Sequence, residues 1–176
     1  LGGRVREDVK RHTGRGVCVT DGQVPLIYDF NMKEYLLPGG GIEEGEDPLM
    51  ALHREIQEEL GYTHAKVTAY LGSYEHNHYH TLKKKYYQDT VTSFLFEIEG
   101  DATSERSDSD KKNAEVRWFS LEEAIVLMRQ SESFGREHIL LEKALQNRDM
   151  FCFEGLAINS DFLNGLSTAD AKEKMI

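Results

Sequence analysis

The chain has 176 residues, enough for one domain with a substantial core, and no apolar run in it approaches the length of a membrane span. The start also lacks the apolar stretch of a signal peptide. The formal net charge of −10 is opposite in sign to the balance typical of nucleic-acid-binding proteins. Cys18 and Cys152 fit buried small residues in a reducing cytoplasm better than a disulfide or a zinc site. We therefore expect a cytoplasmic protein with a small-molecule partner and with no nucleic-acid or membrane partner.

The first part of the chain predicts a hairpin followed by a glycine-rich loop. Residues 16–30 have apolar runs on both sides of Asp21-Gly22, a favourable hairpin turn pair. Residues 35–37 form a short predicted strand, which Pro38 ends. Residues 39–46 contain so much glycine that we expect neither helix nor strand there.

A helix is predicted next, because each of its ends carries a suitable residue. Asp47 is a natural N-cap, Pro48 suits the first helical position, and Gly61 suits the C-terminal cap. Beyond it we predict the following elements: strands at 65–74, 86–98 and 115–119, an exposed loop at 100–113, and helices from a capping box at 120–123 and over 136–145. The irregular alternation favours a mixed sheet flanked by helices over a doubly wound parallel fold.

The predicted helix gathers three carboxylates on one side. At about 100° per residue, Glu55, Glu58 and Glu59 fall together, away from an apolar stripe that begins at Leu49. Like charges at this spacing repel, and the helix dipole disfavours negative charge in the second half of a helix. A hard divalent cation would turn the repulsion into binding. Three glutamates alone, however, are more often an acidic solvent-facing surface.

The spacing of the surrounding residues favours a functional site. Gly40 is followed by Glu46 six residues later and by Arg54 eight residues after that, and Gly61 ends the pattern. At typical residue frequencies a chance match is on the order of one in ten million.

This pattern resembles the Nudix box over residues 40–62: a glycine, five residues, a glutamate, seven residues, then R-E-aliphatic-x-E-E-x-G-aliphatic. Ile56 fills the first aliphatic position, and Tyr62 departs from the last, which is a packing position. The resemblance implies an α/β fold, a Nudix-like α/β/α sandwich around a mixed β-sheet, here with a C-terminal helical extension. We expect a Nudix hydrolase domain at residues 1–150 and a tail at 151–176 that is not a separate domain.

The resemblance also implies roles for individual residues. Glu55, Glu58 and Glu59 would bind Mg²⁺ or Mn²⁺, with the carbonyl of Gly39 as a further ligand. Arg54 would hold carboxylates in place, Glu46 being its usual partner in the family. Gly40, Glu46 and Gly61 would be structural parts of the motif.

The implied reaction is metal-dependent cleavage of a phosphoanhydride bond in a nucleoside diphosphate derivative. Water attacks one phosphorus while metal ions neutralise charge, and a carboxylate takes the proton. The base is either one of the helix glutamates or Glu115, which occupies the place where many family members carry such a residue. An exposed charge at a strand start is the alternative for Glu115. Nucleoside triphosphates, ADP-ribose-like sugars and dinucleoside polyphosphates all remain candidate substrates.

Weaker signals lie outside the box. His76, His78 and His80 alternate in a predicted loop or strand end, for which a solvent-exposed loop is the default interpretation. Substrate contact by His78 is a better alternative than a zinc site, and Tyr79 could stack on a base. Arg15 could reach a phosphate, or it could equally be an ordinary surface arginine. The run 83–85 of lysines is more often a solvated turn than a phosphate site.

Two other functions remain open. The chain could be a nucleotide-sensing Nudix-fold module without turnover, although such proteins usually lose box glutamates. It could also be an acidic helical interaction domain without metal, which would leave the glycine spacing unexplained. The oligomeric state is open, and a homodimer is possible.

Overall fold

The structure is a computed structural model that describes residues 7–80, 82–100, 105–133 and 135–154. Its strands are β1 (Val9–Cys18), β2 (Gln23–Asp29), β3 (Glu34–Leu36), β4 (Gly39–Gly41), β5 (Ala65–His80), β6 (Lys85–Ile98) and β7 (Ala114–Ser120). Its helices are α1 (Pro48–Glu55), the π-helix η1 (Ile56–Leu60), α2 (Asp108–Asn113), α3 (Leu121–Arg129), the 3₁₀-helix η2 (Gly135–Glu137) and α4 (His138–Glu154). Within these residues no helix is both long and apolar enough to cross a membrane.

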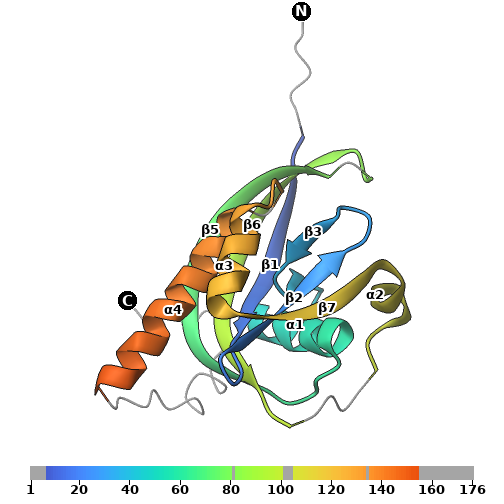
Figure 1. The fold of residues 1–176 in the computed structure, drawn as a ribbon. Coiled ribbons are helices and arrows are strands. Elements are labelled where there is room, and N and C mark those ends of the chain that lie inside the picture. Colours follow the sequence, from blue (N-terminus) through green and yellow to red (C-terminus); the bar gives the residue numbers. More distant parts are fainter. Residues whose placement is uncertain (1–6, 81, 101–104, 134, 155–176) are drawn as a thin grey trace, which may run out of the picture.

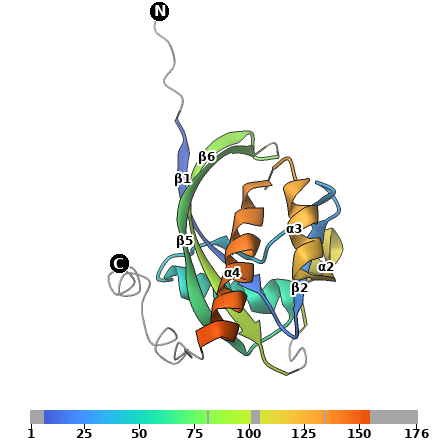
Figure 2. The ribbon, with the colours of Figure 1, turned by 60° about the vertical axis from the view of Figure 1, so that its left-hand side comes forward.

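The strands form two sheets. The larger has the order β4-β1-β6-β5, with β1 and β6 parallel and the other neighbours antiparallel. The smaller has the order β3-β2-β7 and is antiparallel throughout. Helix α1 lies on one side of the larger sheet and α3 and α4 lie on the other (Figures 1 and 2). The predicted mixed α/β arrangement is confirmed, with the strands divided between two sheets.

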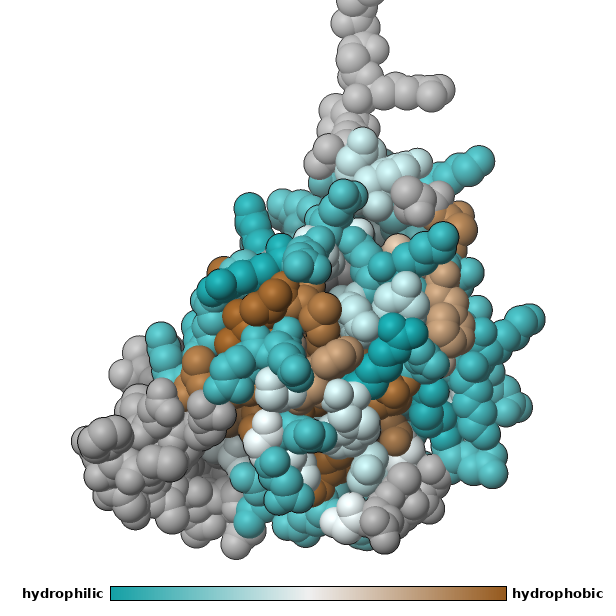
Figure 3. Space-filling view, in the orientation of Figure 1, coloured by the Kyte–Doolittle hydropathy of each residue, from teal (hydrophilic) through white to brown (hydrophobic). Residues whose placement is uncertain are grey.

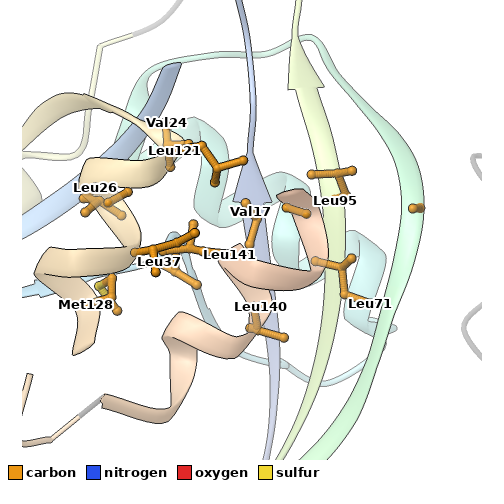
Figure 4. Packing of buried hydrophobic residues seen from close by; sticks show 14 residues of the cluster. Val17, Val24, Leu26, Leu37, Leu71, Leu95, Leu121, Met128, Leu140 and Leu141 are labelled. Carbon is orange, nitrogen blue, oxygen red and sulfur yellow. The ribbon is translucent and has the colours of Figure 1, made fainter. Parts of the chain in front are cut away.

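Two hydrophobic clusters hold these layers together. One joins Leu52 and Ile56 of the glutamate helix to Phe94 and Phe96 of β6. The other packs α3 and α4 against both sheets, with Leu141 of α4 between the two sheets (Figure 4). The face seen in Figure 1 is mostly hydrophilic in the space-filling view, where apolar side chains show through only in patches (Figure 3).

The predicted hairpin over residues 16–30 is wrong beyond its turn. Asp21 and Gly22 adopt positive φ angles of 52° and 73°, and a single bridge joins Thr20 to Gln23. The strands then separate, because β1 pairs with β4 and β6 whereas β2 pairs with β3 and β7. Successive side chains of β1, Val17 and Cys18, are both fully buried. A strand covered on both faces suits the centre of a sheet rather than a two-stranded hairpin.

Three other expectations are also corrected. Residues 39–41, predicted to be irregular, form β4 against β1. The strand predicted at residues 65–74 continues to His80, so the three histidines lie within β5. The predicted loop at 100–113 contains α2, whose N-cap is Ser107.

The ends of the helices follow the sequence signals. Asp47 caps α1 through its side chain, Gly61 ends η1 with a φ of 82°, and Ser120 forms a capping box with Glu123. Helix α4 runs past residue 150, where the predicted domain ends. Residues 155–176 of the predicted tail lie outside the described residues, so the division at 150 stays a prediction.

Candidate active site

The glutamates lie where an α-helix gives way to a π-helix. Helix α1 ends at Glu55, and η1 carries Glu58 and Glu59. Single π turns inside α-helices are rare and occur frequently at functional sites. Leu52 and Ile56 are fully buried against the larger sheet, so the glutamate side of the helix is directed away from that packing.

Arg54 connects the parts of the motif. Its Nε and Nη2 donate to the two carboxylate oxygens of Glu46, at 2.8 and 3.1 Å, and Nη2 also donates to the carbonyl of Gly41 at 3.0 Å. Its Nη1 donates to Glu55 at 2.8 Å and lies 3.5 Å from an oxygen of Glu58. A planar guanidinium can make these forked contacts, which a lysine cannot reproduce. Arg54 therefore joins the loop before the helix, the glycine strand and two of the glutamates.

The glycine strand β4 lies directly against the other side of the glutamates. The backbone N–H of Gly39 donates to Oε2 of Glu59 at 3.0 Å. A Cβ on Gly40 would come within 2.2 Å of Oε1 of Glu55. Any other residue at position 40 would force the Glu55 carboxylate to move away from β4.

The electrostatic environment separates these carboxylates. Hydrogen bonds from Arg54 hold the pKa of Glu46 below its usual value. Burial raises the pKa of Glu55 despite its contact with Arg54. Burial, together with the neighbouring Glu55, raises the pKa of Glu59 well above its usual value. Two adjacent carboxylates whose ionised forms are disfavoured would be stabilised by a nearby cation.

The donor set suits a hard divalent cation, although it is not gathered into a complete coordination shell. In the described part of the chain, no three His, Cys, Asp or Glu side chains surround a common point that could hold a metal. Glu55 and Glu58 turn toward Arg54, and Glu59 turns toward the N–H of Gly39. All the donors here are oxygens, the type that Mg²⁺ and Mn²⁺ prefer. The predicted fourth donor, the carbonyl of Gly39, accepts a hydrogen bond from Arg15 at 3.1 Å.

A later segment closes the C-terminal end of the π-helix. The N–H of Ser107 donates to the carbonyl of Glu58 at 2.9 Å, and Arg106 donates to the carbonyl of Glu59 and to that of Ala114. These bonds satisfy carbonyls at a helix end, where a positive charge is also favoured. They bring Asp110 close enough to contribute to the raised pKa of Glu59.

Asp110 is the acidic residue that sequence reasoning missed. It lies in a segment read as an exposed loop, and its only sequence signal is the acidic run after Ser107, which resembles a helix start. Glu115, the predicted later carboxylate, forms an ion pair with Arg117 on β7. Among the described contacts, none joins Glu115 to a box glutamate, and its role as a base stays a prediction.

Arg15 occupies a buried position beside the glycine strand. Its Nη1 donates to the carbonyls of Leu37 and Gly39, and its Nε lies 3.1 Å from Oε1 of Glu137. Both side chains of this ion pair are less than a tenth exposed. Arg15 thus lies next to the candidate site, but its charge is already paired with Glu137 from η2, and its contact with a phosphate stays a prediction.

The two other predicted substrate contacts lie on opposite faces of β5. His78 is half-buried on the face that continues the core, stacked against Tyr87 at 5.5 Å. Tyr79 is 47% exposed and packs against Tyr86 at 4.8 Å. One ligand on one face of the sheet therefore cannot contact both side chains, because neighbouring residues of a strand alternate between faces.

Comparison with known proteins identifies the family over most of the chain. The family model described as NUDIX domain matches residues 10–141. An RNA pyrophosphohydrolase from Vibrio vulnificus (strain YJ016) is 38% identical over 56 residues, which are 32% of this chain and 33% of that protein. An RNA pyrophosphohydrolase from Aeromonas hydrophila is 35% identical over 57 residues, which are 32% of this chain and 33% of that protein. The match thus spans about a third of the length of these curated relatives.

Solved structures share the fold at low sequence identity. A NUDIX hydrolase from Nitrosomonas europaea is 19% identical with a TM-score of 0.54, covering 77% of this chain and 89% of its own. The E. coli ORF135 protein is 19% identical with a TM-score of 0.56, covering 81% of this chain and 94% of its own. A UDP-X diphosphatase is 21% identical with a TM-score of 0.54, covering 82% of this chain and 66% of its own. The family match, the fold and the glutamate helix against the glycine strand agree, and the chain belongs to the NUDIX family.

Proposed function

We propose that this chain is a divalent-cation-dependent pyrophosphohydrolase that cleaves a phosphoanhydride bond in a nucleoside diphosphate derivative. The observation that carries the proposal is the pair of Glu55 and Glu59 against β4. Their pKa values are raised, and a side chain at Gly40 would displace Glu55. Folding stability alone does not favour two such carboxylates side by side, whereas a cation-binding site requires them.

We assign the roles of the residues as follows. Glu55, Glu58 and Glu59 hold Mg²⁺ or Mn²⁺, Arg54 fixes the orientation of Glu55 and Glu58, and the carbonyl of Gly39 is a candidate further ligand. When bound, the cation neutralises phosphate charge and lowers the pKa of the attacking water. The exposed backbone of β4 lets the phosphates approach without a side chain in the way.

A carboxylate must also accept the proton of the attacking water. One of the box glutamates is a candidate for this base, because these residues lie beside the proposed cation. Asp110 and Glu115 are the later acidic candidates. Asp110 is supported by its electrostatic contact with Glu55 and Glu59, and Glu115 by its position in the sequence.

The substrate that we propose is a small nucleotide derivative in the cytoplasm. Nucleoside triphosphates, ADP-ribose-like sugars and dinucleoside polyphosphates belong in the test panel. The matched relatives are RNA pyrophosphohydrolases, so a 5′-triphosphorylated oligonucleotide belongs there too. The net charge of −10 makes that oligonucleotide the less favoured substrate.

The test is turnover of this panel with Mg²⁺ or Mn²⁺, measured as released phosphate or nucleoside monophosphate. We expect at least one compound to be hydrolysed, with activity lost on chelation and in Glu58→Gln. Activity that persists unchanged in Glu58→Gln and Glu59→Gln would contradict the mechanism. Ligand binding without turnover across the panel would instead support the sensor function.

A further inference from the structure

The segment that leads into α2 holds the end of the glutamate helix from outside. The N–H of Ser107 donates to the carbonyl of Glu58 at 2.9 Å, and Nε of Arg106 donates to the carbonyl of Glu59. These two carbonyls belong to residues whose carboxylates are proposed cation ligands. The segment therefore fixes the backbone from which both of these side chains extend.

The end of a helix is where donors from outside matter most. The last carbonyls of a helix lack partners within it, and Gly61, with a left-handed φ of 82°, turns the chain away from η1. The bonding of η1 is also of the rare π type, which occurs mostly as single turns inside α-helices. The positions of Glu58 and Glu59 therefore depend on contacts made from beyond the helix.

Arg106 joins this helix end to two further elements. Its Nη2 donates to the carbonyl of Ala114, where β7 begins, at 3.2 Å and to that of Asp110 in α2 at 3.4 Å. The guanidinium is half-buried, and its planar set of donors can bond several carbonyls at once. One side chain thus connects η1, α2 and β7.

The same segment places a further carboxylate beside the glutamates. The hydroxyl of Ser107 accepts from the N–H of Asp110 at 3.2 Å and donates to the Asp110 carboxylate. After burial, the charge of Asp110 is among the causes that raise the pKa of both Glu55 and Glu59. A displaced segment would therefore move Asp110 away from the box and release the end of η1 at the same time.

Arg106 differs from the other cation of this segment for which the structure shows a contact. Lys111 forms an exposed ion pair with Glu105 at 2.8 Å, of the kind that contributes little to stability. Among the described residues, the hydrogen bonds of Arg106 all end on backbone carbonyls of three separate elements. A positive charge at the C-terminal end of a helix is also favoured by the helix dipole.

We propose that Arg106 is a positioning residue for the cation site, which holds the last turn of the glutamate helix and Asp110 in the arrangement that binds the cation. The inference rests on the proposed function, because it concerns the same carboxylates. Arg106 acts through Glu58 and Glu59, since its segment bonds their carbonyls and not their carboxylates. Loss of an outer contact that orients metal ligands typically costs about 10–100-fold in metal affinity or activity.

Arg106→Gln and Lys111→Gln are a matched pair, because each removes one cation from the same segment. In Arg106→Gln the Mg²⁺ concentration for half-maximal turnover should rise about tenfold or more, whereas the KM for the nucleotide at saturating Mg²⁺ should stay within about twofold. A smaller folded fraction would lower kcat without this split. In Lys111→Gln both values should stay within about twofold of the wild type.

A second pair of variants tests the backbone contact without removing a charge. Ser107 has a φ of −59°, which proline also adopts, so Ser107→Pro removes the N–H that bonds the carbonyl of Glu58. Ser107→Ala keeps this N–H and loses the same hydroxyl. We expect the proline variant to need about tenfold more Mg²⁺ for half-maximal turnover than the alanine variant.

Two further measurements do not depend on turnover. In the metal-free protein, amide hydrogen exchange at Ser107 should be slow in the wild type and in Lys111→Gln, and about tenfold faster or more in Arg106→Gln, because the bond to η1 is loosened. Calorimetric titration with Mg²⁺ alone should show binding about tenfold weaker or more in Arg106→Gln than in Lys111→Gln.

The outcomes separate this inference from the proposed function. Equal Mg²⁺ dependence and equal Mg²⁺ affinity in Arg106→Gln and Lys111→Gln would overturn the positioning role. The proposed function would then stand if turnover by the wild type requires the cation. A wild type that neither binds Mg²⁺ nor hydrolyses any panel compound would overturn the proposed function and this inference with it.

Discussion

At the scale of single residues, Arg54 organises the candidate site. It donates to Glu46, Glu55 and the carbonyl of Gly41, and its side chain is only 23% exposed. The hydrogen bonds to Glu46 are bidentate, which fixes the plane of the guanidinium. The orientation of Glu55 therefore depends on the shape of Arg54 as well as on its charge.

Arg54→Lys should lower kcat by about tenfold or more, because a lysine keeps the charge but loses the forked contacts. The matched control is Arg129→Lys, at a surface ion pair with Glu142 outside the site. The control should leave kcat within about twofold of the wild type, since exposed pairs contribute little. Equal losses in the two variants would show that charge, not geometry, is what Arg54 supplies.

The glycine strand provides a second residue-level test. Gly40→Ala places a Cβ 2.2 Å from Oε1 of Glu55, whereas a Cβ on Gly41 meets nothing nearer than 3.7 Å. We expect Gly40→Ala to weaken Mg²⁺ binding, measured by calorimetry, because the Glu55 carboxylate must move, and we expect Gly41→Ala to bind like the wild type. Binding by Gly40→Ala as tight as that of the wild type would contradict the close approach of β4 to Glu55.

At the scale of elements, the sequence predicted the glutamate helix well because its signals are local. The cap residue Asp47, the first-position Pro48 and the terminal Gly61 all act on their immediate neighbours. The turn at Asp21-Gly22 was equally local and also formed. Strand pairing was not predictable in this way, because the partners of β1 lie far along the chain in β4 and β6.

In the candidate site, too, the local features were predictable from the sequence and the distant contacts were not. The fixed spacing of Gly40, Glu46 and Arg54 brought them together as expected. Asp110 approaches the box because Arg106 and Ser107 donate hydrogen bonds to carbonyls at the end of η1. The bonded residues are about fifty positions apart in the sequence, so no local pattern encodes the contact. The π turn at Ile56–Leu60 likewise had no signature in the helical periodicity.

The ion pair between Arg15 and Glu137 ties the C-terminal helices to the site. Glu137 precedes α4, and Arg15 holds the carbonyl of Gly39. Glu137→Leu leaves the buried guanidinium without its partner, which should lower the free energy of unfolding by about 3–5 kcal/mol. Glu142→Gln, at the surface pair with Arg129, should cost no more than about 1 kcal/mol. Urea unfolding of both variants measures this, and equal small losses would contradict a structural role for the buried pair.

At the scale of the whole molecule, the raised pKa values of Glu55 and Glu59 link stability to pH and metal. In the metal-free protein the folded state binds more protons than the unfolded chain between the unfolded and folded pKa values. The contribution of these groups to stability is therefore largest below the unfolded pKa and falls as the pH rises through the folded one. Cation binding needs the ionised carboxylates, so it opposes this loss at high pH.

We expect the increase in Tm on adding Mg²⁺ to grow as the pH rises above the ordinary range of carboxylate pKa values, because only the ionised carboxylates bind the cation. Thermal unfolding in EDTA and in excess Mg²⁺ over this rise in pH measures the effect. Glu59→Gln should flatten the dependence. An Mg²⁺ effect of equal size at every pH would contradict the assignment of these carboxylates to the cation.

The central claim is that the glutamates beside β4 perform catalysis, and the turnover of Glu59→Gln tests it most directly. The control is Gln57→Ala, at an exposed position on the same π-helix. On the panel compound that the wild type hydrolyses best with Mg²⁺, Glu59→Gln should lose about 100-fold or more in kcat, the scale of a lost catalytic carboxylate. Gln57→Ala should stay within about twofold of the wild type. Turnover by Glu59→Gln equal to that of Gln57→Ala would contradict the account.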